Sequence, residues 1–322
     1  MRVLVTGCGG YIGTTLTPLL LKRGYRVRCV DWLVFGEDVL KHVAGDPNFE
    51  LVRQDVREVD GSVFSGVDAV VDLAAISNDP AGELDPELTL SINYRARVRN
   101  ARLVAERGVP RYILASSCSV YGRQNGVADE NAEPNPLTTY AKANLLAERE
   151  ILPLASRAFA PTALRFATVY GPSGRMRFDL VVNAMTLTAY AEGRIYVEGD
   201  GMQMRPLVHV VDVARAVAFM LEQPPDAVSG QVFNVGSDDQ NYRIIDVANT
   251  VREVVGGEVV FRGEVDRRSY AVSFAKIKRL GWQPLYTVRD GVRQVYHELL
   301  LGHLKPEERW WTVKWYKKVL GI

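Results

Sequence analysis

The chain has 322 residues, of which 47% are hydrophobic, and this allows one large domain or two fused domains with a proper core. Lysine and arginine number 39 against 38 for aspartate and glutamate, so the formal net charge of +1 provides no field that would attract a polyanion, and no nucleic-acid partner is expected. No long apolar run is present, so no membrane contact is expected either.

The cysteines and the first residues bear on the cellular compartment. Cys8, Cys29 and Cys118 are odd in number, lie in apolar or glycine-rich contexts and lack the spacing of metal ligands. They suit a reducing compartment and imply neither a disulfide framework nor a metal site. A strand-like run follows Met1 with no basic leader, so we expect a cytoplasmic protein.

Short β-branched runs alternate with longer amphipathic stretches in the first half of the chain. This pattern is typical of parallel strands joined by crossover helices, and it predicts an α/β fold with a doubly wound parallel sheet of the Rossmann type. Strands are predicted over residues 2–6, 26–30, 50–53, 69–73 and 111–115, and helices over 15–23 and 88–107.

A glycine-rich turn follows the first predicted strand, in the segment Thr6-Gly-Cys-Gly-Gly-Tyr-Ile-Gly13. Spaced glycines let a backbone turn tightly and approach a pyrophosphate, and the free N–H groups of the next helix then face the phosphates. An ordinary turn is the alternative explanation. Asp31 ends the second strand, where a carboxylate can accept both ribose hydroxyl hydrogens and repel a 2′-phosphate, so NAD is favoured over NADP.

The second half has a different character. A glycine- and proline-rich loop at 170–174 precedes a helix predicted over 180–192, and a strand-like run at 232–235 is expected to rejoin the main sheet. We therefore expect an NAD-binding domain over residues 1–165, with returning segments near 206–240. An interleaved α/β substrate-binding domain is expected mainly over 166–322.

Further segments follow in a characteristic order: Asp55-Val56, Asp72-Leu-Ala-Ala75, Asn93, Ser116-Ser-Cys-Ser-Val-Tyr-Gly122, Tyr140 with Glu148, Arg165-Phe-Ala-Thr-Val-Tyr-Gly-Pro172 and Arg205-Pro-Leu-Val-His-Val-Val-Asp212. In order and spacing, and over nearly the whole chain, they resemble the extended short-chain dehydrogenase/reductase family, and within it nucleotide-sugar epimerases and dehydratases such as the UDP-glucose 4-epimerases. The resemblance implies NAD as cofactor, held by Gly7, Gly10, Tyr11, Ile12, Gly13, Asp31, Asp55, Val56, Leu73, Ala74, Ala75, Asn93, Tyr140 and Asn144.

The same resemblance implies the catalytic pair. In this family a tyrosine phenolate takes the hydroxyl proton of the sugar while hydride leaves for NAD, and a serine or threonine bonds the same oxygen. Tyr140 and Ser117 match these positions. The family lowers the tyrosine pKa, ~10 when free, with a lysine four residues on, but here that place holds Asn144. Lys142 is turned away by about 200° along a helix and is expected on the solvated face.

The missing lysine has several alternative explanations. The enzyme could be slower or work best at alkaline pH, or it could use another base in the site. Alternatively the chain binds NAD and a ligand with little turnover, or the asparagine was introduced by design. Cys118 and Ser119 stand where the family's dehydratases carry an acid pair after the serine, which disfavours a 4,6-dehydratase. We expect Cys118 to be a buried spacer.

The resemblance also implies a sugar-nucleotide substrate. Arg205 and Arg268 match the arginines that neutralise its pyrophosphate, and a guanidinium suits phosphate. Thr168 replaces an asparagine near the substrate, and Ser269 stands where an acidic residue often binds the ribose, so the base stays open. Together the implied substrate-binding residues are Ser117, Thr168, Arg175, Arg177, Asn183, Arg205 and Arg268.

These expectations favour an NAD-dependent epimerase that acts at C4 through a transient 4-keto sugar. A ketoreductase or dehydratase of the same family is the alternative among enzymes, and a non-catalytic NAD and sugar-nucleotide-binding protein is the alternative of another class. By resemblance we expect a homodimer joined through helices over 88–107 and 145–159. The tryptophan-rich tail over 310–316 is expected to pack on the body or on a subunit rather than on a membrane.

Overall fold

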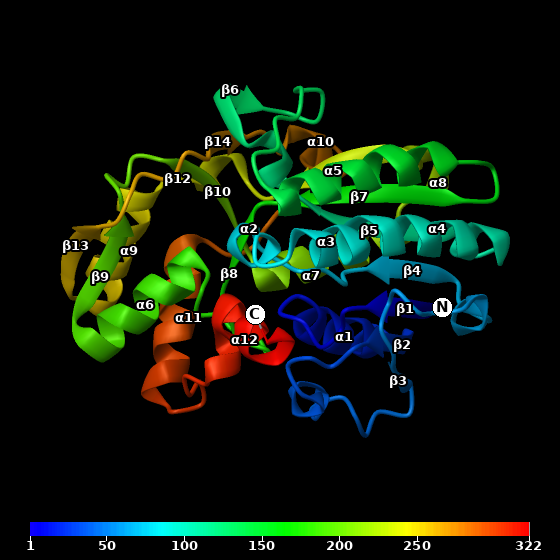
Figure 1. Cartoon of the computed structure of the whole chain (residues 1–322), viewed down its shortest axis with the longest axis horizontal. Coiled ribbons are helices and arrows are strands. Elements are labelled where there is room, and N and C mark those ends of the chain that lie inside the picture. The colour runs from blue at the N-terminus through cyan, green and yellow to red at the C-terminus, as the bar shows by residue number, and fades with distance from the viewer. Residues whose placement is uncertain (322) are drawn as a thin grey trace.

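The computed structural model describes residues 1–321, and a seven-stranded parallel sheet organises it (Figure 1). The strand order is β11-β7-β5-β4-β1-β2-β3. Because β2 and β4 lie on opposite sides of β1, the order reverses between β1 and β4, and α/β sheets bind ligands at such a reversal. The strands are β1 (Arg2–Thr6), β2 (Arg26–Asp31), β3 (Phe49–Arg53), β4 (Ala69–Asp72), β5 (Arg111–Ser117), β7 (Ala160–Phe166) and β11 (Gln231–Val235).

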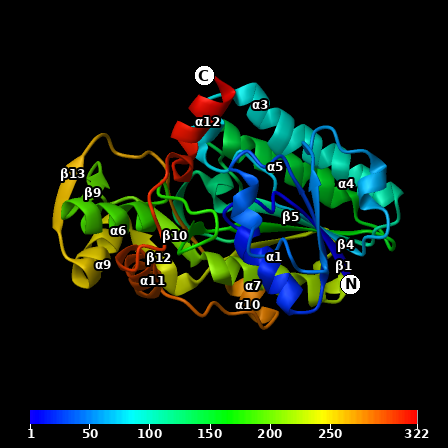
Figure 2. The same cartoon turned by 90° about the horizontal axis from the view of Figure 1, so that it is seen from below.

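Helices cover both faces of this sheet, as Figure 2 shows. Along β1 the side chains alternate, so that Val3 and Val5 pack in one cluster with Leu16, while Leu4 packs in another with Val98. The two clusters give the sheet a core on each side, which confirms the doubly wound fold. The covering helices are α1 (Gly13–Lys22) and α7 (Val210–Glu222) on one face, and α4 (Arg97–Glu106) and α5 (Thr139–Ile151) on the other.

The helix predicted over 88–107 is divided in the structure. It consists of α3 (Pro86–Leu90), a π-helical turn over Ser91–Ala96 and α4. Within the wide turn Asn93 makes two hydrogen bonds to the backbone of Ile76, a tertiary contact that apolar spacing does not reveal.

The helix predicted over 145–159 is also shorter than expected. It belongs to α5, which ends at Ile151, and Pro153 follows in a 3₁₀ turn over Leu152–Leu154. Proline restricts the residue before it and cannot continue the helical hydrogen bonds, so the chain turns at 156–159 into β7.

A smaller part of the molecule lies beyond the carboxyl ends of the large sheet. A third apolar cluster joins β9 (Arg194–Glu198) to helices α6 (Val181–Glu192), α9 (Ile244–Val255) and α11 (Val288–Leu300). The boundary at residue 165 stays a prediction, but β11 pairs with β7, so the chain returns to the large sheet after building strands of the small ones. These strands are β8 (Thr168–Tyr170), β10 (Met204–His209) and β12 (Asn241–Arg243) in one sheet, β9 (Arg194–Glu198) with β13 (Glu258–Arg262), and β6 (Arg123–Ala128) with β14 (Ser269–Val272).

The remaining helices are short or lie near the carboxyl end of the chain. None of the helices within residues 1–321 has the length and apolar character needed to span a bilayer. Their bounds are α2 (Asp79–Gly82), α6 (Val181–Glu192), α8 (Pro225–Val228), α9 (Ile244–Val255), α10 (Ala275–Arg279), α11 (Val288–Leu300) and α12 (Thr312–Leu320). Short 3₁₀ turns lie at Glu37–Leu40, Gly61–Phe64, Cys118–Tyr121, Asp238–Gln240 and Glu308–Trp310.

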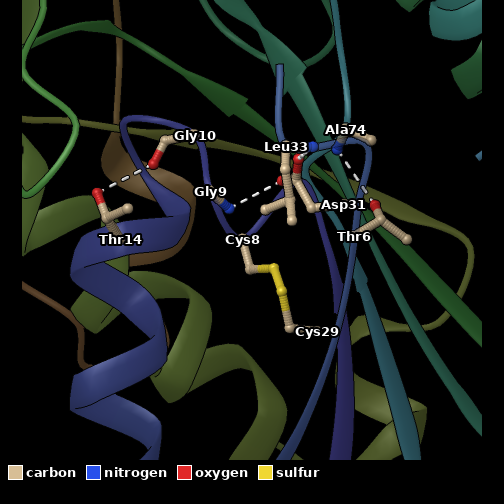
Figure 3. Close-up of a disulfide and its surroundings, with 9 residues drawn as sticks. All are labelled: Thr6, Cys8, Gly9, Gly10, Thr14, Cys29, Asp31, Leu33 and Ala74. Atoms are coloured by element: carbon tan, nitrogen blue, oxygen red, sulfur yellow. Dashed lines mark hydrogen bonds between the residues drawn. A yellow bond between two sulfur atoms is a disulfide. The ribbon is translucent and has the colours of Figure 1, made fainter. Parts of the chain in front are cut away.

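Two of the cysteines form a disulfide. Cys8 in the glycine-rich turn is bonded to Cys29 on β2, with their Cα atoms 5.8 Å apart and both side chains fully buried (Figure 3). The expectation of a chain without disulfides is therefore wrong, and the cysteines no longer support a reducing compartment. The pairing depends on β1 and β2 lying side by side, which brings together residues 21 positions apart.

Candidate active site

The three spaced glycines have distinct structural reasons to be glycine. Gly7 has φ of +71°, and a Cβ there would lie 2.7 Å from the backbone nitrogen of Ala74. A Cβ on Gly13 would lie 2.4 Å from the Cα of Cys8, so this residue lets α1 pack against the turn. A Cβ on Gly10 would meet only the carbonyl oxygen of Gly7, at 3.1 Å, and Gly10 lines a cavity. The turn therefore leaves its open side for a ligand that approaches the backbone closely.

Asp31 joins this turn to the end of β2. Its Oδ2 accepts a hydrogen bond from the Gly9 N–H at 2.8 Å, and its Oδ1 accepts one from the Leu33 N–H at 2.6 Å (Figure 3). Burial raises the pKa of Asp31, while the bonds from Leu33 and Gly9 oppose that rise. Each oxygen keeps acceptor capacity, so the carboxylate can also receive ribose hydroxyls.

The cavity has a volume of about 550 Å³ and lies at the carboxyl ends of the large sheet. It brings together most of the residues singled out in the sequence. Those that line it are Gly7, Gly10, Tyr11, Ile12, Gly13, Asp31, Asp55, Val56, Leu73, Ala74, Ala75, Ser117, Tyr140, Thr168, Arg175, Arg177, Arg205 and Arg268.

Asn93 and Asn183 were expected to contact ligands, but neither lines the cavity and both are fully buried. Asn93 holds the loop after β4 through Ile76, at 2.8 and 2.9 Å. Asn183 donates to the Tyr11 hydroxyl at 3.1 Å and accepts from the Gly171 N–H at 2.9 Å. Their amide groups are satisfied by protein atoms, so both residues position the walls of the site.

Tyr140 and Ser117 come from different elements and face the same cavity. Tyr140 lies in the first turn of α5, which Thr138 caps by accepting from the Ala141 N–H at 3.2 Å, and Ser117 ends β5. Burial, with the nearby charge of Asp79, raises the pKa of Tyr140. The neighbouring Ser117 hydroxyl and the charges of Arg97 and Arg177 lower this pKa and so oppose that rise.

Asn144 lies one helical turn beyond Tyr140 but behind the cavity wall. Its Nδ2 donates to the Tyr140 carbonyl at 2.9 Å, and its Oδ1 accepts from Arg97 Nη1 at 2.9 Å. It is buried and does not line the cavity, and its contact with the cofactor stays a prediction. Lys142 is exposed, as its helical phase predicts. Sequence reasoning missed Arg97, because an arginine in a helix full of arginines has no distinguishing local signal.

Arg175 lies at the glycine-turn end of the cavity rather than beside Arg205. Its Nη2 donates to Thr312 Oγ1 at 3.1 Å, and its guanidinium lies 3.6 Å from the Phe35 ring centroid. Its Nε is buried and has no hydrogen-bond partner within residues 1–321. Burial and the charge of Arg177 lower its pKa to about 9. A buried cation with an unused donor, beside the start of α1, fits the pyrophosphate of a dinucleotide.

Four charged side chains form a cluster at the other end of the cavity. Arg205 and Arg268 both pair with Asp266, at 2.8 and 2.6 Å, and Arg268 also pairs with Asp79 of α2. The sequence predicted the two arginines, but it gave no sign of these carboxylates because neither lies in a recognised segment. Arg177 instead pairs with Asp179 at 2.7 Å, midway along the wall.

Cys118, which was expected to be a buried spacer, and His209 both have structural roles. The Cys118 thiol is buried and donates to the Arg165 carbonyl at 3.3 Å, and burial raises its pKa. His209 caps α7 by accepting from the Val211 N–H at 3.2 Å through Nδ1. Neither side chain lines the cavity.

A turn shaped for a dinucleotide opens onto the same cavity as Tyr140 and Ser117. Together with the doubly wound sheet, this arrangement defines a dinucleotide-dependent enzyme of the Rossmann type. Residues 3–236 match the model of the NAD dependent epimerase/dehydratase family, and the chain belongs to that family. Its cofactor is therefore NAD.

Similar proteins have several activities. The chain is 26% identical over 311 residues to the uncharacterized UDP-glucose epimerase YtcB of Bacillus subtilis, covering 91% of this chain and 96% of that protein. It is 28% identical over 311 residues to UDP-glucuronic acid decarboxylase 1 of Xenopus tropicalis, covering 92% and 71%. The solved structure of MoeE5 with UDP-glucuronic acid and NAD is similar, with a TM-score of 0.82 at 28% identity, covering 94% of this chain and 100% of that one.

Proposed function

We propose that this enzyme epimerises a nucleotide sugar at C4 through a transient 4-keto sugar. The observation that carries the proposal is that Tyr140 and Ser117 face one cavity whose two ends carry separate cationic groups. Arg175 stands at the glycine-turn end, and Arg205 with Arg268 stands at the other. Such a cavity suits two diphosphates, one of a dinucleotide and one of a sugar nucleotide.

The residues divide the work by position. Asp31 would accept ribose hydroxyls, and the Gly10 backbone with Arg175 would hold the cofactor pyrophosphate. NAD, when bound, supplies a hydride acceptor that can return the hydride to the same carbon. Tyr140 would take up and return the hydroxyl proton, while Ser117 holds that oxygen. Cys118 and Ser119 follow Ser117 without an acid pair, which supports epimerisation over loss of water.

We also propose that the chain forms a homodimer through α4 and α5. This rests on the family resemblance and is checked by light scattering during size-exclusion chromatography.

The reaction is tested by incubating the NAD-loaded protein with UDP-, dTDP-, GDP- and CDP-sugars, including UDP-glucose and UDP-glucuronic acid. NMR follows the products, and NADH absorbance is recorded in parallel. We expect one sugar to give its C4 epimer with no net NADH. Release of carbon dioxide or accumulation of a 4-keto-6-deoxy sugar would instead identify a decarboxylase or a dehydratase. Binding of UDP and NAD with no turnover up to about pH 10, the pKa of a free tyrosine, would identify a binding protein.

A variant pair ties the reaction to the proposed residues. Tyr140→Phe removes the proton-transfer group and should lower the rate about 10²–10⁴-fold, the usual contribution of general acid–base catalysis. Tyr190→Phe is the matched control, because Tyr190 is 43% exposed and does not line the cavity. Equal rates for the two variants would remove Tyr140 from the mechanism.

A further inference from the structure

Arg97 is a buried cation at the floor of the active-site cavity. Its side chain is 3% exposed, and it begins α4 directly after the π-helical turn Ser91–Ala96. Its Nε donates to the Ala74 carbonyl at 3.1 Å, and its Nη1 donates to the Ala115 carbonyl at 3.0 Å. Ala74 follows β4 by two residues and Ala115 lies two residues before the end of β5, and both line the cavity, so the guanidinium is fixed beside these strand ends.

The counter-charge of Arg97 is the buried carboxylate of Asp72. Asp72 Oδ2 is 3.8 Å from Arg97 Nε, and Asp72 already accepts from Thr6 Oγ1 at 2.6 Å and from the Tyr112 hydroxyl at 2.5 Å. A buried arginine is retained only with such compensation, because removing water from a charge is costly. No residue in the part of the chain described here accepts a hydrogen bond from Arg97 Nη2, although Arg97 lines the cavity.

The contact between Arg97 and Asn144 links this cation to the backbone of Tyr140, whose side chain lines the same cavity as Arg97. Arg97 Nη1 donates to Asn144 Oδ1 at 2.9 Å, and Asn144 Nδ2 donates to the Tyr140 carbonyl at 2.9 Å. We propose that Arg97 is a positioning residue that supplies, from α4 and through Asn144, the positive charge beside Tyr140 that a lysine at position 144 would otherwise supply. The inference rests on the proposed function, since it assigns Tyr140 as the acid–base group.

Repulsion between the Arg97 guanidinium and a lysine ammonium explains why asparagine stands at position 144. A lysine there would bring an ammonium group against the Arg97 guanidinium, and two buried like charges in contact repel each other strongly. Asparagine offers an acceptor to Arg97 and a donor to the helix backbone, so it satisfies both neighbours. Arg97 and Asn144 are therefore a matched pair: with Arg97 present, position 144 takes a neutral residue that accepts a hydrogen bond rather than a lysine.

Other charges around Tyr140 have to be considered with Arg97. Asp79 of α2 acts against the phenolate, and Arg177 favours it but is already paired with Asp179. Glu83 faces the start of α5, where it accepts from the Thr139 N–H at 2.6 Å. Arg97 is thus the cation bonded to the same helix turn that carries Tyr140, and removing it should raise the pKa of the phenol.

The test measures the phenol directly as well as the reaction. The NAD-loaded protein is titrated with base while near-ultraviolet absorbance reports phenolate, and subtraction of the same titration in a Tyr140→Phe background isolates Tyr140. Arg97→Gln is expected to shift this titration upward by about one pH unit, the lower end of the effect of a neighbouring charge. The acid limb of the kcat–pH profile should move by the same amount. Asp79→Asn should move both in the opposite direction.

Arg102→Gln is the matched control, because Arg102 lies on the same helix and forms an exposed pair with Glu150 at 2.8 Å. It should leave the titration and the profile unchanged. A folded Arg97→Gln protein whose Tyr140 titrates as in the unmodified chain would overturn the inference. The phenolate titration needs no sugar substrate, so it can support the role of Arg97 even if no C4 epimer forms. Conversely, C4 epimerisation with an unchanged titration in Arg97→Gln would support the proposed function and contradict the role of Arg97.

A double variant keeps the test informative if Arg97→Gln does not fold. Asn144→Lys alone should lose thermal stability and gain no activity, because the new ammonium group contacts Arg97. Arg97→Gln/Asn144→Lys should recover stability and bring the phenolate titration to within about half a pH unit of the original, since one cation is again present. An Asn144→Lys protein with raised activity at neutral pH, or a double variant no better than either single variant, would contradict the matched pair.

Discussion

Single buried polar residues in this protein are mostly satisfied by one another, and this decides which of them can meet a ligand. Asn93 and Asn183 match positions of functional interest in the sequence, yet the amide of Asn93 is bonded to backbone groups and that of Asn183 to backbone groups and the Tyr11 hydroxyl. Arg175 differs, because one of its donors has no partner among residues 1–321 while it lines the cavity. Residue type and position singled out all three residues, and only the structure shows which of their polar groups already have partners within the protein.

His209 gives a pH prediction at this scale. Burial lowers its pKa to about 4, against 6.5 in an unfolded chain. The folded protein therefore stays unprotonated where the unfolded chain takes up a proton, and stability present above about pH 6.5 falls as pH drops toward 4, by up to ~3 kcal/mol. His209→Asn, which keeps a capping acceptor for α7, should flatten this part of the stability curve.

The measurement is urea unfolding at several values between about pH 7.5 and pH 4.5, chosen to span the shift. His297→Asn is the control, since the His297 side chain is 67% exposed. Parallel curves for His209→Asn and the unmodified protein would show that this histidine does not carry the acid sensitivity.

At the scale of elements, the carboxyl-terminal helix α12 belongs to the cofactor end of the site. Tyr316 lines the cavity with its ring centroid 5.7 Å from that of Phe35, and Trp315 Nε1 donates to the Val34 carbonyl at 2.7 Å. Arg309, just before the helix, pairs with Asp38 at 2.6 Å. The tryptophan-rich tail thus packs on the body of the chain, where it covers the loop after β2.

Tyr316→Ala should therefore loosen cofactor binding. Removing this ring opens the wall beside Phe35 and Arg175, and truncating a buried aromatic costs about 3 kcal/mol of folding free energy. We expect less NAD per chain after gel filtration and faster NAD release, measured by dilution into excess labelled NAD. Lys318→Ala is the control on the same helix, because it removes an exposed pair with Glu308 and a contact with the Trp315 ring while Lys318 does not line the cavity, and it should retain NAD. Equal retention by both variants would show that α12 does not hold the cofactor.

At the scale of the whole molecule, the cavity is closed by ion pairs between distant segments. Arg268, near β14, pairs with Asp79 of α2, 189 positions earlier in the chain, and shares Asp266 with Arg205. A nucleotide diphosphate placed here would offer oxygens in competition with these carboxylates. The carboxylates of Asp79 and Asp266 already neutralise the two arginines, so a diphosphate has to replace existing ion pairs when it binds. This exchange of partners suits reversible binding of an anionic substrate.

Arg268→Gln should weaken UDP binding about tenfold, because a charge-assisted hydrogen bond to phosphate contributes about 1.5–3 kcal/mol. Calorimetry with UDP at low and moderate salt measures the loss, and the variant should also show a smaller salt dependence. Arg243→Gln, an exposed arginine on β12 that does not line the cavity, is the control. Unchanged UDP affinity in Arg268→Gln would move the diphosphate site elsewhere.

Much of the cofactor half could be predicted from the sequence, because its signals lie within single strand–turn–helix units. The glycine spacing and Asp31 depend on neighbours a few residues away or on one adjacent strand, and strand limits follow from side-chain alternation. The helices over 88–107 and 145–159 were predicted less well. A tertiary bond from Asn93 accompanies the wide turn in the first, and Pro153 ends the second.

The sequence by itself determined the sheet, the NAD-binding turn and the family to which the chain belongs, because these are encoded in short-range periodicity and in the order of motifs. Only the tertiary structure decided the Cys8–Cys29 bond, the place of Arg175 at the cofactor end, and the pairing of Arg97 with Asn144. Each of these joins side chains from different elements, 21 to 137 positions apart. Packing rather than local spacing sets such distances, so the Arg97 guanidinium can be recognised as the cation next to Asn144 only once α4 and α5 lie side by side.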